Sequence, residues 1–310
     1  MNIFMDRVDF NSTAGPHWFG RKLADCLTKN GHNIVSPFGD HKVDAHLAFV
    51  QASGRIADVP LFQRLDGIWY NTEVDYKDMN TPIKSTYDIA DGVIFQSEWS
   101  KKLVETHFGK AKNSKVIHNG VDFSTIQSVA PAAGLENYEN VWSCAAGWEG
   151  EPPNNAPRYI KRLEENIRYF QEHSGDRDIL CVAGAVSYLP NPDPQKILFL
   201  GELNIPNLYS LYQRSSYFLH LGRFDNCPNV VIDARAAGCQ IICTSLGGTQ
   251  EVAGKDAIII EEDEWDFNPF AYNVPTTLDF TRKRANTYDV DICLESVASS
   301  YLTFMKELTI

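Results

Sequence analysis

The stretch from 224 to 254, FDNCPNVVIDARAAGCQIICTSLGGTQEVAG, alternates apolar runs with polar turns in an order that decides the fold. Its middle predicts a helix that Pro228 opens and Gly238 ends, because proline suits the first helical turn and glycine the residue after the last. An apolar strand over 240–245 and a pair of glycines follow directly. A helix between short apolar strands is typical of a parallel sheet, which binds ligands at the carboxyl ends of its strands.

The same alternation runs through both halves of the 310 residues, so we expect an α/β protein with two doubly wound parallel sheets. A chain of this length is about twice the usual size of a domain. We expect a Rossmann-like domain over 1–122, a second one over 123–289, and a helix over 290–310 that packs back toward the first. The predicted strands are 1–6, 32–36, 45–50, 60–65, 90–97, 114–122, 141–148, 178–184, 197–203, 217–222 and 240–245, and the predicted helices are 18–30, 97–108, 157–173, 207–216, 228–238 and 293–308.

Composition argues against several classes of protein. Hydrophobic residues at 44% and charged residues at 22% describe an ordinary globular chain. No uninterrupted apolar stretch is long enough to span a membrane, and MNIFMDRVDF does not resemble a secretory signal. We therefore expect a cytoplasmic protein, in the host cytoplasm if the protein is viral. Seven cysteines without paired CxxC motifs indicate neither a disulfide framework nor a zinc site.

The formal net charge of −12 lies in one half of the chain. Residues 1–120 hold 14 basic and 14 acidic side chains, whereas residues 121–310 hold 14 basic and 26 acidic ones. Nucleic-acid binding by counterion release needs a basic face, so a dedicated nucleic-acid-binding protein is not indicated. A polyanionic acceptor would approach the neutral N-terminal half more easily. Dinucleotide, P-loop and zinc-protease motifs do not occur in the sequence.

Two acids, Asp225 and Asp233, flank the start of the helix in the opening stretch, with seven residues between them. Asp225 falls in the loop after a strand and Asp233 one turn into the helix, while free N–H groups near Asn229 and Val230 attract an anion. A nucleotide diphosphate attached to a polyol would suit these groups. The turn at 247–249 lets the backbone approach a ligand closely. Each acid alone could be a structural residue, but the combination favours a binding site.

This segment resembles the family 4 glycosyltransferases, retaining enzymes with the GT-B fold, in which two Rossmann-like domains with parallel sheets face a central cleft. The family's Glu-x7-Glu motif corresponds to Asp225 and Asp233, its small-residue helix end to 236–238, and its Gly-Gly-x-x-Glu turn to 247–251. Aspartate is shorter than the family's glutamate by one methylene. The resemblance implies that Asp225 contacts the donor sugar, Asp233 the nucleotide ribose, and the backbone of 227–230 the sugar and phosphates.

The resemblance extends to cations and to two further loops. RYIKRL at 158–163 resembles the cations that clamp the diphosphate, with Arg158 and Lys161 both open as the clamp and a solvated helix start as the alternative. STAGP at 12–16 resembles the loop that lies against the donor phosphates, through Gly15. Backbone recognition of the base is expected around Leu203.

QRLDG at 63–67 resembles an Arg-Leu-Asp-Gly motif of a compact subgroup, expected to point into the cleft. Arg64 and Asp66, together with His17, are the acceptor-side residues this implies. Arg64 and Asp66 are candidates for acceptor contact or proton handling, but they could equally form a buried ion pair. QSE at 96–98 and HNGVD at 118–122 also resemble family landmarks.

Taken together, the resemblance implies a hexosyl- or pentosyltransferase that moves a sugar from a nucleotide-diphosphate sugar to an acceptor hydroxyl with retention, without a metal or another cofactor. The implied catalytic residues are Asp225, Lys161, Arg158 and Asp66. The implied donor-binding residues are Gly15, Arg158, Lys161, Leu203, Asp225, Asn226, Cys227, Pro228, Asn229, Val230, Asp233, Gly247 and Gly248. Two Asp-x-Asp matches, at 176–178 and 289–291, are interpreted as accidental rather than as metal sites.

Several alternatives stay open from the sequence. The acceptor could be a glycan, a lipid-linked sugar, a protein or a hydroxylated base of viral DNA. A nucleotide-sugar epimerase or phosphorylase on the same fold, or a sugar-nucleotide-binding protein without catalysis, would carry much the same residues. The oligomeric state is equally open.

Overall fold

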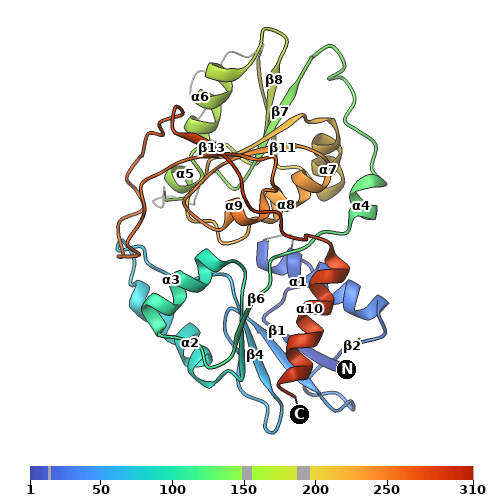
Figure 1. Ribbon diagram of the computed structural model, residues 1–310. Helices are drawn as coiled ribbons and strands as arrows, with labels where there is room; N and C mark the ends of the chain where they lie inside the picture. The colour runs from blue at the N-terminus through green and yellow to red at the C-terminus, as the bar shows by residue number, and fades with distance from the viewer. Residues whose placement is uncertain (13–14, 149–155, 187–195, 310) are drawn as a thin grey trace. The chain divides into compact units, whose positions relative to one another are not determined.

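The structure is a computed structural model that describes residues 1–12, 15–148, 156–186 and 196–309, with the backbone alone for 156–158 (Figure 1). The chain divides into two compact units. Unit 1 comprises Met1–Asp122, Asp266–Phe270 and Asp291–Ile310, and unit 2 comprises Phe123–Trp265 and Ala271–Val290. The chain therefore enters unit 2 after Asp122 and returns to unit 1 for its last segment.

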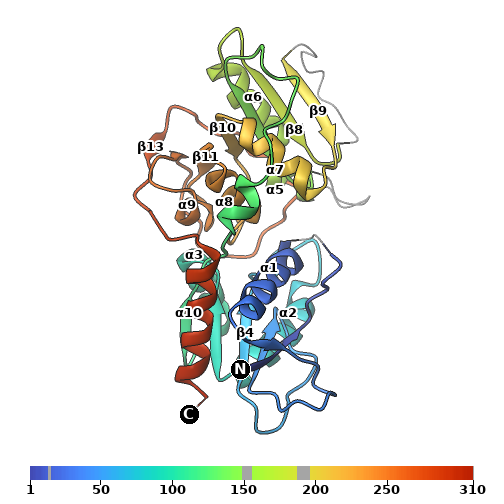
Figure 2. The same ribbon diagram turned by 90° about the vertical axis from the view of Figure 1, so that its right-hand side faces the viewer.

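Unit 1 is built on a six-stranded parallel sheet in the order β2-β1-β3-β4-β5-β6. Its strands are β1 Asn2–Asp6, β2 Asn33–Ile34, β3 Ala45–Phe49, β4 Leu61–Leu65, β5 Gly92–Phe95 and β6 Ser114–Val116, and its helices are α1 Gly15–Lys29, α2 Tyr76–Ile89, α3 Glu98–Phe108 and α10 Leu294–Glu307. Strands β3, β4 and β5 are buried along their whole length, as expected for a sheet covered on both faces. Helices α1 and α10 lie side by side (Figures 1 and 2).

Unit 2 is built on a seven-stranded sheet in the order β13-β12-β11-β10-β7-β8-β9, parallel except for β13. Its strands are β7 Val141–Ala145, β8 Ile179–Ala183, β9 Ile197–Gly201, β10 Tyr217–His220, β11 Gln240–Thr244, β12 Ile258–Ile260 and β13 Lys283–Ala285, and its helices are α4 Phe123–Gln127, α5 Ala156–Lys161, α6 Leu163–His173, α7 Ile205–Arg214, α8 Asn229–Ala236 and α9 Thr249–Val252. The predicted α/β class with two largely parallel sheets is thus confirmed.

Each unit has its own hydrophobic core. In unit 1, residues of the sheet such as Ile3 and Phe62 pack with Phe304 and other residues of α10. In unit 2, Trp142 and Phe170 belong to a cluster between the sheet and α6. The parts of the sequence that the structure describes contain no helix long and apolar enough to cross a membrane. All seven cysteines are free thiols.

Several elements differ from the sequence prediction, among them the short helices α4 and α9, which were not predicted. Helix α2 was not predicted, because Pro82 lies inside it and few strong helix formers surround that proline. The helix predicted over 157–173 is two helices, since Arg162 adopts a left-handed conformation with φ 55° between them. Strands β12 and β13 extend the second sheet beyond its predicted edge.

Candidate functional site

The loop after β10 brings the predicted donor residues of unit 2 together at the carboxyl edge of the sheet. The backbone N–H of Arg223 donates to the carbonyl of Ile160 at 2.9 Å, which ties this loop to the end of α5. Gly222 permits that approach, because a Cβ there would lie 3.3 Å from the Ile160 carbonyl oxygen and 3.6 Å from the Lys161 Cα. The last residue of α5, Lys161, therefore sits beside the first residues after β10.

Lys161, Asp225 and His220 form a compact charged group at this edge. The Lys161 ammonium donates to Asp225 Oδ1 at 2.7 Å and Oδ2 at 2.8 Å, and His220 Nε2 lies 2.7 Å from Oδ2. Burial alone would raise the pKa of Asp225, but the Lys161 charge and the His220 hydrogen bond hold that pKa well below its usual range. Asp225 is consequently an anion at neutral pH. Its side chain is 21% exposed and that of Lys161 is 26% exposed, so a ligand can reach both.

The glycine turn after β11 fixes the backbone of Asp225. Gly247 has φ 130°, and a Cβ at this residue would lie 3.0 Å from the Asp225 carbonyl oxygen and 3.2 Å from its nitrogen. The N–H of Gly248 donates to the same carbonyl at 2.8 Å. Both conformational freedom and close approach therefore require glycine at 247. The role of this turn in the structure is to hold Asp225, whether or not the turn also contacts a ligand.

Helix α8 begins at Asn229, four residues after Asp225, with Pro228 as a cap that makes no side-chain hydrogen bond. Asn226, Asn229 and Val230 around this start are partly exposed, whereas Cys227 is buried. The positive end of the helix dipole at an N-terminus without a side-chain cap favours an anion. The start of α8 thus adds a second attraction for negative charge close to Lys161.

Asp233 lies deeper than a surface ribose contact would require. The residue is only 3% exposed, and the Tyr209 hydroxyl lies 3.5 Å from its Oδ2. A ribose hydroxyl could reach this carboxylate only after neighbouring side chains move. Contact between Asp233 and the ribose stays a prediction.

The remaining donor-side residues occupy separate places. Gly15 is the exposed first residue of α1 in unit 1, and Leu203 follows β9 in unit 2. Arg158 lies in α5, and its side chain is outside the described part of the chain. The neighbouring Arg162 is buried and binds Glu262 through both terminal nitrogens at 3.0 and 2.6 Å, so it holds the fold of unit 2.

The acceptor-side motif in unit 1 requires a correction for Arg64. This residue is fully buried, and its guanidinium carbon lies 4.6 Å from the centre of the Phe19 ring and 4.8 Å from that of Phe49. The guanidinium pairs with Asp66 and donates to Asn119 Oδ1 at 2.7 Å. Arg64 is therefore the buried ion-pair partner that the sequence left as an alternative, and it does not offer its charge to an acceptor.

Asp66 keeps some access to solvent, with 19% of its side chain exposed. Burial raises the pKa of this carboxyl, and the charges of Arg64 and His17 oppose the rise. The His17 Nδ1 accepts a hydrogen bond from the Asp9 backbone at 3.2 Å. Asp66 and His17 thus remain the acceptor-side predictions at the carboxyl edge of the first sheet.

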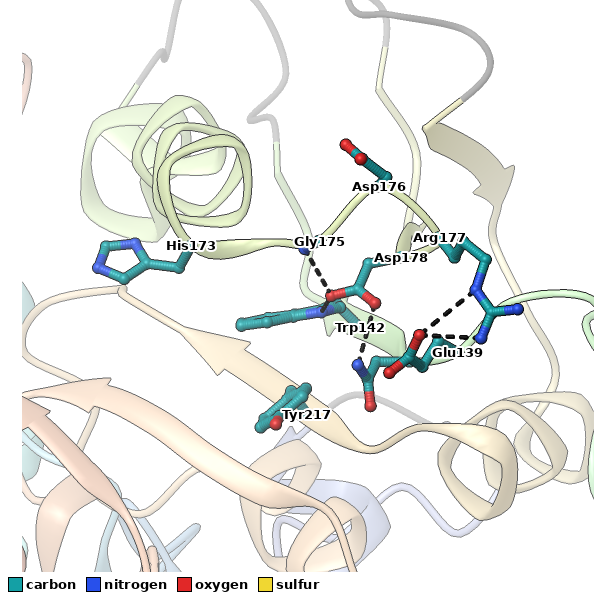
Figure 3. Close-up of a pocket in the computed structure, with 9 residues that line it drawn as sticks. Glu139, Trp142, His173, Gly175, Asp176, Arg177, Asp178 and Tyr217 are labelled. Carbon is teal, nitrogen blue, oxygen red and sulfur yellow. Dashed lines mark hydrogen bonds and ion pairs between the residues drawn. The ribbon is translucent and has the colours of Figure 1, made fainter.

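The Asp-x-Asp match at 176–178 has a structural role. Asp178 accepts hydrogen bonds from the Gly175 backbone, the Trp142 indole and the Asn140 amide, each at 3.0 Å (Figure 3). These residues line a cavity of about 470 Å³ at the amino ends of β7, β8 and β10, the edge opposite Asp225. Over the described residues, no group of three or more His, Cys, Asp and Glu side chains is placed to hold a metal ion.

Sequence reasoning missed His220. His220 was not among the predicted site residues, although it lies in the strand predicted over 217–222 and Asp225 follows five residues later. The spacing of five residues across a short loop was the sequence feature that could have indicated a contact between the two side chains. The contact itself depends on the fold of the loop, which the spacing alone does not determine.

Comparison with known proteins identifies one matching family model and several similar folds. Residues 158–274 match the family model described as glycosyl transferases group 1. No curated protein sequence matches the chain. The chain is similar to the structure of AviGT4, a glycosyltransferase involved in avilamycin A biosynthesis, at 14% identity with a TM-score of 0.63, covering 100% of this chain and 98% of that one.

Two further structures cover the whole chain. Sucrose-phosphate synthase from Thermosynechococcus elongatus is 10% identical with a TM-score of 0.61, over 92% of its own chain. HepE from Anabaena, in complex with UDP and glucose, is 14% identical with a TM-score of 0.58, over 91% of its own chain. Identities this low show the fold alone. The chain therefore has the GT-B fold of these glycosyltransferases, and its residues 158–274, which include Lys161 and Asp225, resemble the group 1 glycosyltransferases.

Proposed function

We propose that the protein is a glycosyltransferase that moves a sugar from a nucleotide-diphosphate sugar to an acceptor hydroxyl with retention of configuration and without a metal ion. The observation that carries the proposal is the contact of Lys161 with Asp225 beside the start of α8. This edge of unit 2 offers a cation and helix N–H groups for a diphosphate, and a carboxylate for sugar hydroxyls, within one small region.

In the proposed reaction, Lys161 and the start of α8 stabilise the departing diphosphate, with Arg158 as a second cation. Preorganised cations and N–H groups lower the barrier because they face the charge that develops on the leaving group. Asp225 accepts hydrogen bonds from the donor sugar, and Asp233 is assigned to the ribose. The acceptor hydroxyl attacks the anomeric carbon from the face that the phosphate leaves and gives its proton to the departing phosphate oxygen as the bond from the sugar to that oxygen breaks, so the reaction needs no covalent nucleophile.

The donor is a nucleotide sugar, and a uridine diphosphate sugar is the first to test, because the similar HepE structure contains UDP and glucose. The acceptor side is assigned to unit 1, with Asp66 and His17 in reach of the acceptor. The assay below distinguishes four acceptor classes: a glycan, a lipid-linked sugar, a protein and a modified DNA base.

The test is product analysis with UDP-, GDP-, ADP-, CDP- and TDP-sugars in the presence of EDTA, against panels of sugar, lipid-linked, peptide and hydroxymethylated DNA acceptors. Transfer that survives EDTA, with an anomeric proton coupling that matches the donor, supports the proposal. An altered donor without transfer indicates an epimerase, and binding without any product indicates a non-catalytic protein.

Two variants link activity to the site. Asp225→Ala should lower the rate of transfer by roughly a hundredfold or more while leaving the fold intact, since one preorganised polar contact is worth that much in kcat. Lys255→Ala, which removes an exposed lysine of the same unit, is the matched control and should keep the wild-type rate. Equal rates in Asp225→Ala and wild type would refute the site assignment.

A further inference from the structure

The carboxylate of Asp225 is shared between two basic groups of different chemistry. Lys161 contacts both of its oxygens, and His220 contacts Oδ2 from the carboxyl end of β10. Lysine keeps its positive charge at neutral pH, whereas histidine is the side chain that gains or loses a proton in that range. Only one of the two partners can therefore change its charge to suit a ligand.

The proposed function requires Lys161 to turn from Asp225 toward the donor diphosphate. Asp225 would then keep its negative charge in a mostly buried position without its compensating ammonium. Removing one partner of such an ion pair is costly, because the remaining charge is poorly solvated. His220, which is 5% exposed and within hydrogen-bond distance, is the group left to compensate that charge.

We infer that His220 is a positioning residue for Asp225 and that it takes up one proton from solvent when Lys161 moves from Asp225 to the donor diphosphate. This inference rests on the proposed function. A neutral His220 donates through Nε2 to the carboxylate, so the incoming proton binds Nδ1 and no other covalent bond changes.

The surroundings of β10 hold charges of both signs, because the buried Arg162 donates to the carbonyl of Leu221, the residue after His220, at 3.3 Å and pairs with Glu262. Burial raises the pKa of Cys243, which lies beside His220 on β11, to about 12, so this thiol is neutral. Buried carboxylates on the adjacent α8 and α9 attract positive charge. The titratable and charged groups on the elements around this face are Lys161 of α5, Arg162 before α6 with its partner Glu262, Tyr209 and Tyr212 of α7, Asp233 of α8, Cys144 of β7, Cys243 of β11 and Glu251 of α9.

The experiment is titration calorimetry of wild-type protein with the nucleotide sugar that raises its melting temperature most, beginning with UDP-glucose. Titrations at one pH in buffers of different ionisation enthalpy give the number of protons taken up. The diphosphate of a nucleotide sugar is esterified at both ends and does not titrate near neutral pH, so the protons belong to the protein. We expect net uptake approaching one proton, and affinity that falls by up to about tenfold per pH unit above neutrality.

His220→Gln isolates the residue, because glutamine keeps an N–H donor but cannot take a charge. This variant should melt close to wild type, bind the donor more weakly and take up no proton. The matched control is His173→Gln, a histidine at the opposite edge of the sheet whose Nδ1 contacts the Tyr169 carbonyl at 2.9 Å. Figure 3 shows the position of His173 beside the cavity at that edge, and this control should keep wild-type proton uptake.

The outcomes separate this inference from the proposed function. Donor binding by the wild type without proton uptake overturns the role of His220 and leaves the proposed function standing, as does unchanged uptake in His220→Gln. If no nucleotide sugar binds, the proposed function fails and this inference fails with it. The wild-type titration decides the question even if His220→Gln does not fold.

Discussion

At the scale of single residues, Arg64 belongs to a polar motif but stabilises the interior of unit 1. Its guanidinium lies between two aromatic rings and pairs with Asp66 inside unit 1. Removing one member of a buried ion pair leaves the charge of the other member, here Asp66, uncompensated. We therefore expect Arg64→Ala to lower the free energy of unfolding by about 3–5 kcal/mol. Urea unfolding measures this cost.

The matched control for Arg64 is Arg55→Ala, which removes an arginine that pairs with Asp91 on the surface at 2.9 Å. Exposed pairs contribute about 0–1 kcal/mol, so this variant should unfold almost as wild type does. If the two variants lost the same amount of unfolding free energy, the Arg64–Asp66 pair would stabilise the fold no more than an exposed pair does.

Asp225 should give the site a characteristic acid response. Because its pKa is lower in the folded chain than the ordinary value of about 3.9 in an unfolded one, the ion pair stabilises the fold above that value. The stabilisation is lost as the pH falls through the lowered pKa. We expect Asp225→Asn to lower the urea midpoint at pH 7, with a difference from wild type that shrinks below about pH 4. A difference that stays constant down to pH 3, as expected for the exposed Asp176→Asn control, would contradict the pairing.

Whether the sequence could indicate the role of a residue depends on whether its contacts are local or come from distant segments. Asp225 and Lys161 could be predicted because acids and cations near helix ends carry a local signal. Whether Arg64 is exposed, or whether His220 reaches Asp225, depends on how distant segments pack, and a single sequence contains no local sign of that. The burial of Asp233 has the same origin, since Tyr209 comes from another helix.

At the scale of elements, the turn after β11 decides where Asp225 lies. Gly247→Ala would force a left-handed residue to carry a Cβ 3.0 Å from the Asp225 carbonyl oxygen. We expect this variant to lose both stability and donor affinity, each by at least about tenfold in the equilibrium constant, from backbone strain of about 1–3 kcal/mol together with the steric contact. Melting curves and donor titrations measure the two effects.

Gly238→Ala provides the control for this turn. Its φ of 97° gives a comparable backbone penalty, but no atom lies within 4 Å of a Cβ at that position. It should therefore lose stability while keeping donor affinity. Equal loss of affinity in both variants would mean that the contact of Gly247 with Asp225 does not position the site.

Element prediction succeeded where amphipathic periodicity was strong and failed where tertiary contacts override it. Helix α8 and strands β10 and β11 have clear apolar patterns bounded by glycine and proline. The break at Arg162 has no such sign, because Glu262 and Thr276 hold its side chain from far along the chain. The proline in α2 pointed away from a helix that its packing nevertheless stabilises.

At the scale of the whole molecule, the two units have separate cores, and α10 belongs to the first. Phe304 of α10 packs against Phe62 of β4 with ring centres 5.9 Å apart. We expect Phe304→Ala to lower the melting transition of unit 1 by about 3–5 kcal/mol in stability, whereas Thr303→Ala, an exposed neighbour, should stay within about 0.5 kcal/mol of wild type. Scanning calorimetry should show the transition of unit 2 unchanged. A fall of both transitions together would contradict independent cores.

The central claim is that unit 2 binds a nucleotide-diphosphate sugar through Lys161 and Asp225. The most direct measurement is the melting temperature of wild type and of Lys161→Ala with UDP-, GDP-, ADP-, CDP- and TDP-sugars in EDTA, since a ligand of the folded state raises that temperature by mass action. The account predicts a rise with one nucleotide family that EDTA does not change and that Lys161→Ala abolishes. No rise with any nucleotide sugar, or an equal rise in the variant, would contradict it.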